Sequence, residues 1–129
     1  SNVLDLYSGS GILGFESASR GAESITFVEI DHKAINLLIK NKNKFSNHIF
    51  HIVKKRSTAF LNNTDENYDL IFADPPYGNM DYMELMNICI EKLAKNGKLI
   101  LEMRNNDFSF AGAIVKHYGE TKIILYTKK

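Results

Sequence analysis

The sequence has few of the features that mark secreted or membrane proteins. Among its 129 residues there is one cysteine, Cys89, so an internal disulfide framework is excluded. No apolar run approaches the roughly 20 residues of a membrane span, and no signal-peptide pattern is visible. Lys plus Arg number 16 and Asp plus Glu 15, so no overall positive field points to nucleic acid. We expect a cytoplasmic protein.

Length and the first residues bear on domain organisation. A chain of 129 residues fits one domain with a single core. It is already in an apolar run by Val3, with no polar segment before it. We therefore expect residues 1–129 to form one domain that lacks an N-terminal segment of a longer protein.

Short apolar runs alternate with helical patterns along the chain. The runs typical of strands cover 3–11, 24–31, 48–53, 68–73 and 98–103. The helical patterns cover 12–21, 32–45, 57–63 and 80–97, with Asp31 as a cap and Gly21 and Gly97 as C-terminal stops. Residues 113–129 are typical of two strands that turn near Gly119.

This order of elements predicts an α/β fold. We expect a Rossmann-like, mostly parallel seven-stranded sheet with helices on both faces and an antiparallel C-terminal strand pair. The strand at 68–73 is expected to be buried on both faces. Ligands of such sheets bind at the carboxyl ends of the strands.

A glycine motif follows the first strand. Gly9, Gly11 and Gly14 form G-x-G-x-x-G between a strand and a helix, where the backbone can turn tightly and approach a ligand. Glu29 ends the second strand about 20 residues later, where its carboxylate can accept hydrogen bonds from a ribose diol. The pattern predicts a nucleoside site, although glycines that serve only a tight turn would leave the same pattern.

Asp5 favours one class of nucleoside ligand over another. It lies in the first strand, four residues before Gly9, where a negative charge gives a pyrophosphate no advantage. S-adenosylmethionine carries a positive sulfonium and a positive ammonium, which a carboxylate attracts. Alternatively, Asp5 only hydrogen-bonds to the glycine loop and holds its shape.

The strand at 68–73 stops on Asp74, Pro75, Pro76 and Tyr77. The prolines end the strand and stiffen the loop because proline cannot donate to a ladder. The Asp74 side chain and the Pro75 carbonyl can accept both hydrogens of an exocyclic amine, while Tyr77 stacks on the attached base. Two acceptors out of the ring plane would aim the nitrogen lone pair at a methyl sulfonium nearby. This chemistry needs positioning and electrostatics and no metal.

These motifs resemble a known family. "VLDLYSGSG", "FVEID" and "FADPPYG", in this order, are similar to class I S-adenosylmethionine-dependent methyltransferases that act on exocyclic amines. The stretch "LDLYSGSGILGFESASRGAESITFVEID" followed by "YDLIFADPPYG" resembles the bacterial 16S ribosomal RNA (guanine-N2) methyltransferases. The resemblance implies a single methyltransferase catalytic domain, cytoplasmic and monomeric, that acts on 16S ribosomal RNA or the small ribosomal subunit.

The resemblance also implies the site residues. The target amine would be held by Asp74, Pro75, Pro76 and Tyr77. The S-adenosylmethionine site would comprise Asp5, Tyr7, Gly9, Ser10, Gly11, Glu29, Ile30, Arg56, Ser57 and Asp74. One departure is Arg56, which stands where the family usually has an acidic residue that contacts the adenine amine. Backbone groups near Arg56 and Ser57 are the substitute that the sequence offers.

The sequence therefore predicts methylation of a guanine amine in 16S ribosomal RNA. Two alternatives stay open: a DNA adenine-N6 methyltransferase, for which no separate target-recognition segment is visible, and a cofactor- or RNA-binding domain without turnover. A nicotinamide dehydrogenase ranks behind both, because Asp5 and the prolines give that chemistry no help. The four histidines show no metal-binding spacing, and no metal is expected.

Overall fold

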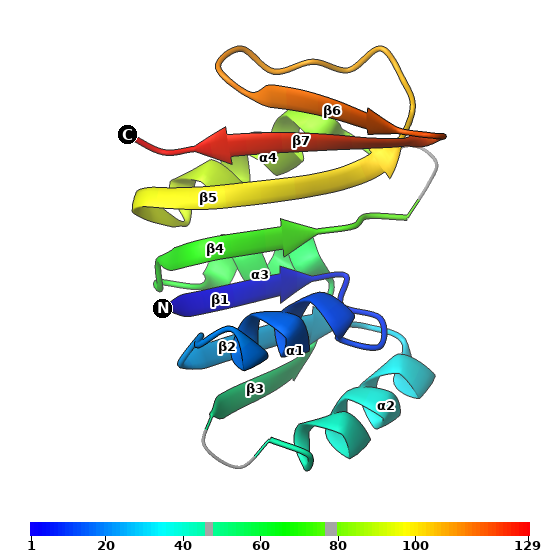
Figure 1. Ribbon diagram of the computed structural model, residues 1–129, viewed down its shortest axis with the longest axis vertical. Coiled ribbons are helices and arrows are strands. Elements are labelled where there is room, and N and C mark those ends of the chain that lie inside the picture. The colour runs from blue at the N-terminus through cyan, green and yellow to red at the C-terminus, as the bar shows by residue number, and fades with distance from the viewer. Residues whose placement is uncertain (46–47, 77–79) are drawn as a thin grey trace.

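The sheet has seven strands in the order β3-β2-β1-β4-β5-β7-β6 (Figure 1). The computed structural model describes residues 1–45, 48–76 and 80–129. Its strands are β1 (Asn2–Leu6), β2 (Ser24–Glu29), β3 (Ile49–Lys54), β4 (Tyr68–Ala73), β5 (Leu93–Arg104), β6 (Ile114–Tyr118) and β7 (Thr121–Thr127). Its helices are α1 (Ile12–Ser19), α2 (His32–Lys42), α3 (Ser57–Asn63) and α4 (Tyr82–Glu91).

The strand order places a switch point between β1 and β4. Strands β1 to β5 pair in parallel, while β7 runs antiparallel to both β5 and β6. From β1 the chain moves outward to β2 and β3, and it then returns to add β4 on the other side of β1. The loops after β1 and β4 therefore leave the same edge of the sheet side by side, which is the usual ligand position in such folds. The predicted Rossmann-like fold is confirmed.

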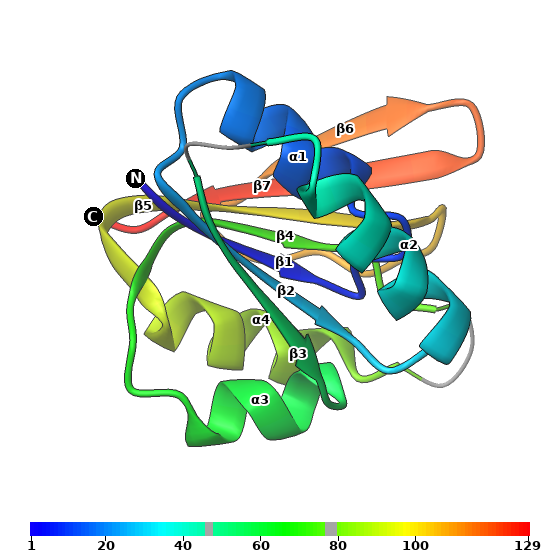
Figure 2. The ribbon, with the colours of Figure 1, turned by 90° about the horizontal axis from the view of Figure 1, so that it is seen from below.

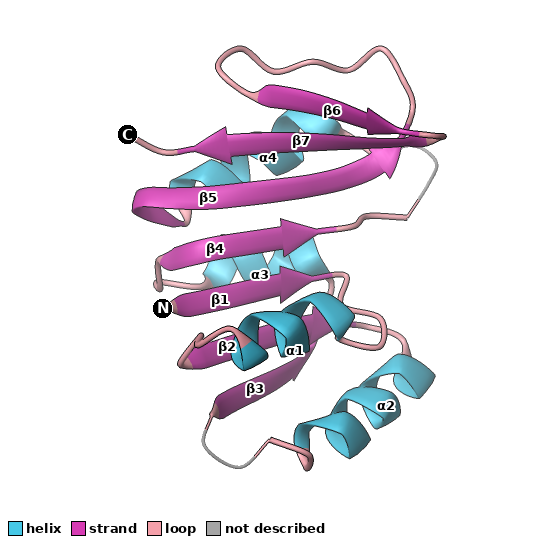
Figure 3. Ribbon diagram, viewed as in Figure 1, coloured by secondary structure: helices cyan, strands magenta, loops and turns pink. Residues whose placement is uncertain are grey.

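Helices cover both faces of the sheet. Helices α1 and α2 lie on one face, and α3 and α4 lie on the other (Figures 2 and 3). The alternation of side chains divides the core accordingly. Val3 and Phe27 pack beneath α1, whereas Leu4 and Ile71 belong to the cluster under α3 and α4. No helix in the described part of the chain is long and apolar enough to span a membrane.

Two predicted helix ends have the expected chemistry. The Asp31 side chain caps α2 by accepting a hydrogen bond from the Ala34 amide at 2.9 Å. Gly21 follows α1 with φ of +105°, and its amide donates to the Ala18 carbonyl at 3.1 Å. Left-handed backbone at this point is tolerated because glycine has no Cβ. The two signals mark the points at which α1 ends before β2 and α2 begins after it.

The helix predicted over 80–97 is wrong at its C-terminal end. Helix α4 stops at Glu91, and β5 begins at Leu93. The Lys128 ammonium donates to the carbonyls of Ile90 and Leu93 at 3.0 and 3.1 Å, so a distant residue satisfies the helix end. Gly97 is instead a close-packed strand residue, since a Cβ there would lie 2.9 Å from the Tyr68 carbonyl oxygen. Tertiary contacts therefore override a locally plausible stop signal.

Strand β4 is covered on one face more fully than on the other. Ile71 and Ala73 are buried toward α3 and α4, but Leu70 and Phe72 are only half-buried. A groove of about 450 Å³ borders these two side chains and also contacts Val3 and Leu13. The expectation of burial on both faces is therefore only partly right, because no helix in the described residues lies over this part of the sheet.

Candidate active site at the switch point

The loop after β1 adopts backbone that favours glycine. Gly9 and Gly11 have φ of +56° and +82°, and Tyr7 shares this left-handed conformation at +56°. A Cβ on Gly9 would meet nothing within 4 Å, so its backbone is open to a ligand. A Cβ on Gly11 would instead press against the Phe15 ring at 2.7 Å. Gly9 thus suits close ligand approach, whereas Gly11 serves the turn and the packing of α1.

Gly14 brings α1 against β1 and gives Asp5 a partner. Its amide donates to Asp5 Oδ2 at 3.1 Å. A Cβ on Gly14 would collide with the Phe27 ring and lie 3.1 Å from the same Asp5 oxygen. One Asp5 oxygen therefore holds the glycine loop, which agrees with the structural alternative for this residue. Asp5 also lines a cavity, described below, so it is placed to attract a positively charged ligand as well.

Burial makes Asp5 an unusual carboxyl group. Its side chain is 3 % exposed, and desolvation raises its pKa from 3.8 to about 7. The hydrogen bond from Gly14 lowers the pKa, while the charges of Asp74 and Glu29 raise it further. A cation placed beside Asp5 would favour its ionised form. The site is therefore electrostatically suited to a positively charged ligand.

Glu29, at the end of β2, joins the glycine loop to the turn that follows β2. Its Oε1 accepts from the Gly9 amide, and its Oε2 accepts from the amides of Ile30 and Asp31, all at 2.8 Å. A carboxylate offers about four lone-pair sites, so it can still accept a further bond. The position predicted to bind a ribose diol is thus held rigidly against the glycine loop.

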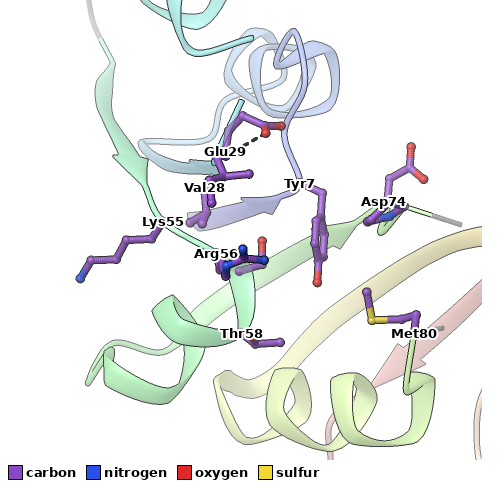
Figure 4. Close-up of a pocket in the computed structure, with 11 residues that line it drawn as sticks. Tyr7, Val28, Glu29, Lys55, Arg56, Thr58, Asp74 and Met80 are labelled. Atoms are coloured by element: carbon purple, nitrogen blue, oxygen red, sulfur yellow. Dashed lines mark hydrogen bonds between the residues drawn. The ribbon is translucent and has the colours of Figure 1, made fainter. Parts of the chain in front are cut away.

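Two cavities open at this edge of the sheet. Cavity A, of about 460 Å³, is lined by Tyr7, Val28, Glu29, Ile30, Lys55, Arg56, Ser57, Thr58, Asp74, Pro76 and Met80 (Figure 4). Cavity B, of about 330 Å³, is lined by Asp5, Tyr7, Ser8, Gly9, Ser10, Ile12, Leu13, Asp74 and Glu102. Volumes of this size are typical of small-molecule sites. Tyr7 and Asp74 line both cavities, so the two spaces adjoin.

Most of the predicted cofactor residues meet in these cavities, with Tyr7 between them. Figure 4 shows the Tyr7 ring extending toward the space between α3 and Met80. Burial raises the pKa of the Tyr7 hydroxyl, and a hydrogen bond with Ser57 opposes that rise. Arg56 lines cavity A as the N-cap residue of α3, and Ser57 beside it is buried. Gly11 lines neither cavity.

The loop after β4 is described only in part. Asp74 is exposed, Pro75 is buried and Pro76 is exposed at the rim of cavity A. Partial desolvation raises the pKa of Asp74. Tyr77, the predicted stacking residue, lies outside the described residues. The roles given to Asp74, Pro75 and Pro76 therefore stay predictions with a suitable location.

Glu102 is a site residue that the sequence did not reveal. It lines cavity B, and its pKa is raised by burial and then by the charge of Asp74. The signal that could have found it is strand register, because Ala73 pairs with Leu101 and the next residues along are Asp74 and Glu102. The register between β4 and β5 cannot be predicted from one sequence.

Comparison with known proteins identifies the family. The family model described as Conserved hypothetical protein 95 matches residues 1–127. The chain belongs to this family. A relative named Ribosomal RNA small subunit methyltransferase D, from Buchnera aphidicola, is 36% identical over 107 residues, covering 81% of the chain and 55% of the relative. The chain thus spans about half the length of that curated relative, and the resemblance predicted from the motifs is confirmed.

Solved structures that resemble this member of the Conserved hypothetical protein 95 family share its fold. A conserved hypothetical protein of Streptococcus pyogenes superposes with a TM-score of 0.85 at 27% identity, over 99% of this chain and 86% of that one. The Thermus thermophilus 16S rRNA N2 G1207 methyltransferase, solved with AdoMet and guanosine, gives a TM-score of 0.77 at 23% identity, over 99% and 37%. The second likeness shows the fold alone, which is that of a class I methyltransferase.

Proposed function

We propose that this chain is the catalytic domain of an S-adenosylmethionine-dependent methyltransferase acting on the exocyclic amine of a guanine in 16S ribosomal RNA. The observation that carries the proposal is the position of Asp74, which lines both cavities beside the glycine loop. A nucleoside ligand in the cavities and an amine held by Asp74 would meet at one edge of the sheet. The name of the Buchnera aphidicola relative supports ribosomal RNA as the substrate.

The described residues fit S-adenosylmethionine. Gly9 leaves its backbone open, and Glu29 keeps acceptor capacity next to it. Asp5 places a carboxylate of raised pKa on cavity B, where a positive ligand would favour its charged form. The cofactor would supply a methyl group on a positively charged sulfur. Arg56 and Ser57 would border the adenine, and neither contributes a carboxylate there, so recognition would rest on Ser57 and on backbone groups.

Asp74 would orient the target amine. The nitrogen lone pair of a guanine amine is delocalised into the ring, so the amine is a weak nucleophile. Acceptors such as the Asp74 carboxylate would draw its hydrogens out of the ring plane and aim the lone pair. The prolines would hold those acceptors still, which is how positioning lowers a barrier without covalent catalysis. The amine would lose one proton to solvent as the new nitrogen–carbon bond forms.

Substitution of Asp74 tests the proposal. Asp74→Ala removes the acceptor without filling cavity A, so methyl transfer should fall roughly 100-fold or more while cofactor affinity changes little. Asp74→Asn keeps one acceptor oxygen and should lose less. The assay is radiolabelled methyl transfer to small ribosomal subunits that lack the modification, with mapping of the labelled nucleotide. Isothermal titration with S-adenosylmethionine measures cofactor affinity separately.

Controls and contrary outcomes follow from the same measurements. Asp65→Ala removes an exposed carboxylate just before β4, at the opposite edge of the sheet, and should leave transfer unchanged. Unchanged transfer by Asp74→Ala would contradict the role of Asp74. Label on adenine in DNA would support the adenine-methyltransferase alternative. Cofactor binding without transfer to any substrate would support a domain that binds and does not turn over.

A further inference from the structure

Glu102 is placed by strand register as the lateral neighbour of Asp74. Ala73 on β4 pairs with Leu101 on β5, so the next residues, Asp74 and Glu102, follow at the same edge. Leu101 and Met103 are buried in the cluster under α3 and α4. Because side chains alternate along a strand, Glu102 faces the other side of the sheet, where cavity B lies.

Among the described residues, no Lys or Arg side chain lines cavity B with Glu102. The charged side chains that line cavity B are three carboxylates, Asp5, Asp74 and Glu102. The rest of its lining is uncharged and comprises Tyr7, Ser8, Gly9, Ser10 and the exposed apolar side chains of Ile12 and Leu13. Within the described residues the Glu102 side chain forms no hydrogen bond or ion pair, and no group of His, Cys, Asp and Glu could hold a metal ion. Desolvation and the charge of Asp74 both raise the pKa of Glu102. Such an arrangement suits a ligand that presents hydrogen-bond donors.

The chemistry of guanine matches two neighbouring carboxylates. On its pairing edge guanine presents the N1–H donor directly beside the exocyclic amine donor. Adenine presents its amine beside N1, which is an acceptor. A carboxylate placed there would meet the N1 lone pair with a lone pair of its own, and the two would repel. A site built to hydrogen-bond a donor strongly rejects an analogue that lacks it, because the buried acceptor then stays unpaired.

We propose that Glu102 is a specificity-determining residue that accepts a hydrogen bond from N1–H of the target guanine, while Asp74 holds the adjacent amine. The inference rests on the proposed function, since it concerns the same base in the same site. It explains how a loop that recognises an amino group would be restricted to guanine: the selecting group comes from β5 and not from the loop itself.

The test uses a base that keeps the 2-amino group, replaces the neighbouring N1–H donor by an acceptor nitrogen and lacks the C6 carbonyl; the loss of the carbonyl is the same for every variant. In 2-aminopurine the 2-amino group is present, but N1 is an acceptor. Small subunits are assembled with 16S ribosomal RNA carrying either guanine or 2-aminopurine at the mapped nucleotide. The ratio of kcat/KM for the two bases is then compared between the unchanged protein and its variants. Intrinsic differences in amine reactivity cancel in this comparison, because they are the same for every variant.

Glu102→Gln gives the sharpest prediction. The Gln amide can donate to N1 of 2-aminopurine, so the preference for guanine should shrink about 10- to 100-fold relative to the unchanged protein. Glu102→Ala should lower the guanine rate by about 10-fold or more and also reduce the preference. Glu91→Gln, at the exposed end of α4, serves as the matched control and should leave the ratio unchanged. Affinity for S-adenosylmethionine should be the same in all of them.

Three results would overturn the inference. An unchanged ratio in Glu102→Gln and Glu102→Ala, with guanine still methylated, would remove Glu102 from base selection and leave the proposed function standing. A loss of S-adenosylmethionine affinity with an unchanged ratio would assign Glu102 to the cofactor. Failure of the unchanged protein to methylate either base would refute the proposed function, and with it the inference.

Discussion

Replacement of Asp5 by Asn should stabilise the ligand-free protein at neutral pH. The Asp5 carboxyl is 3 % exposed, and its pKa is raised to about 7, chiefly by desolvation. In the unfolded chain it ionises near 3.8. Between these two values the folded state binds a proton that the unfolded state has lost. The contribution of Asp5 to the free energy of unfolding is therefore fully present below about pH 4 and is lost as pH rises toward 7.

The size of the effect follows from the two pKa values. The difference between about 7 and 3.8 corresponds to roughly 4 kcal/mol at about 1.36 kcal/mol per pH unit. Asn carries no charge, and its amide oxygen can still accept the Gly14 hydrogen bond. Asp5→Asn should therefore match the unchanged protein near pH 4 and exceed it in free energy of unfolding by about 2 to 4 kcal/mol at pH 8.

Denaturant unfolding of both proteins from pH 4 to pH 8 measures this difference. Titrating groups that do not interact with Asp5 contribute equally to both proteins and cancel in the subtraction, so what remains is Asp5 and its coupling to Asp74 and Glu29. Asp65→Asn, which removes an exposed carboxyl group, should give a difference near zero at every pH. A difference between Asp5→Asn and the unchanged protein that stays flat from pH 4 to 8 would refute the reasoning.

The same substitution links stability to the proposed cofactor. A positive ligand beside Asp5 favours the ionised carboxylate, so binding should strengthen as pH rises from 6 to 8 and should release protons below pH 7. Asp5→Asn should bind S-adenosylmethionine more weakly and lose this pH dependence. This measurement separates the two roles of Asp5, because only the ligand-binding role predicts that protons are released when the cofactor binds.

Two further substitutions test the local structure of the site. Gly14→Ala should lower the free energy of unfolding by about 1 to 3 kcal/mol, because the added Cβ would overlap the Phe27 ring. Denaturant titration measures this loss. A free energy of unfolding equal to that of the unchanged protein would contradict this packing. Asp31→Ala should cost about 1 kcal/mol by removing the α2 cap, whereas Asp31→Asn should retain most of it; equal losses in the two variants would show that the cap is not the cause.

The fold was largely predictable because its signals are local. Alternating apolar runs and helical patterns gave the element order, and the Asp31 cap and Gly21 are read within a few residues of the chain. The end of α4 was not predictable in this way. Lys128, 38 residues after Ile90, donates to the Ile90 carbonyl in the last turn of α4, and no local pattern encodes that contact. Half-burial of Leu70 and Phe72 likewise depends on which helices reach that face of the sheet.

The residues of the candidate site likewise differ in whether a local motif predicts them. The glycine loop, Glu29 and the Asp74 loop each have a motif, and the structure brings them to one edge of the sheet. Glu102 has no motif, since nothing in "LILEMR" separates a site carboxylate from an ordinary polar position on a strand. Its proximity to Asp74 comes only from the pairing of β4 with β5.

This difference bears on what the Asp74 loop can encode. A rigid acceptor next to a cofactor cavity selects an amino group, and adenine, cytosine and guanine all have one. Discrimination among them requires a second polar group at the atom beside the amine. That atom is a donor only in guanine, so a carboxylate there selects guanine whereas an amide or a hydroxyl could serve the other bases. The strand next to the loop supplies a carboxylate at Glu102, so the base would be chosen by β5 while the loop fixes the chemistry.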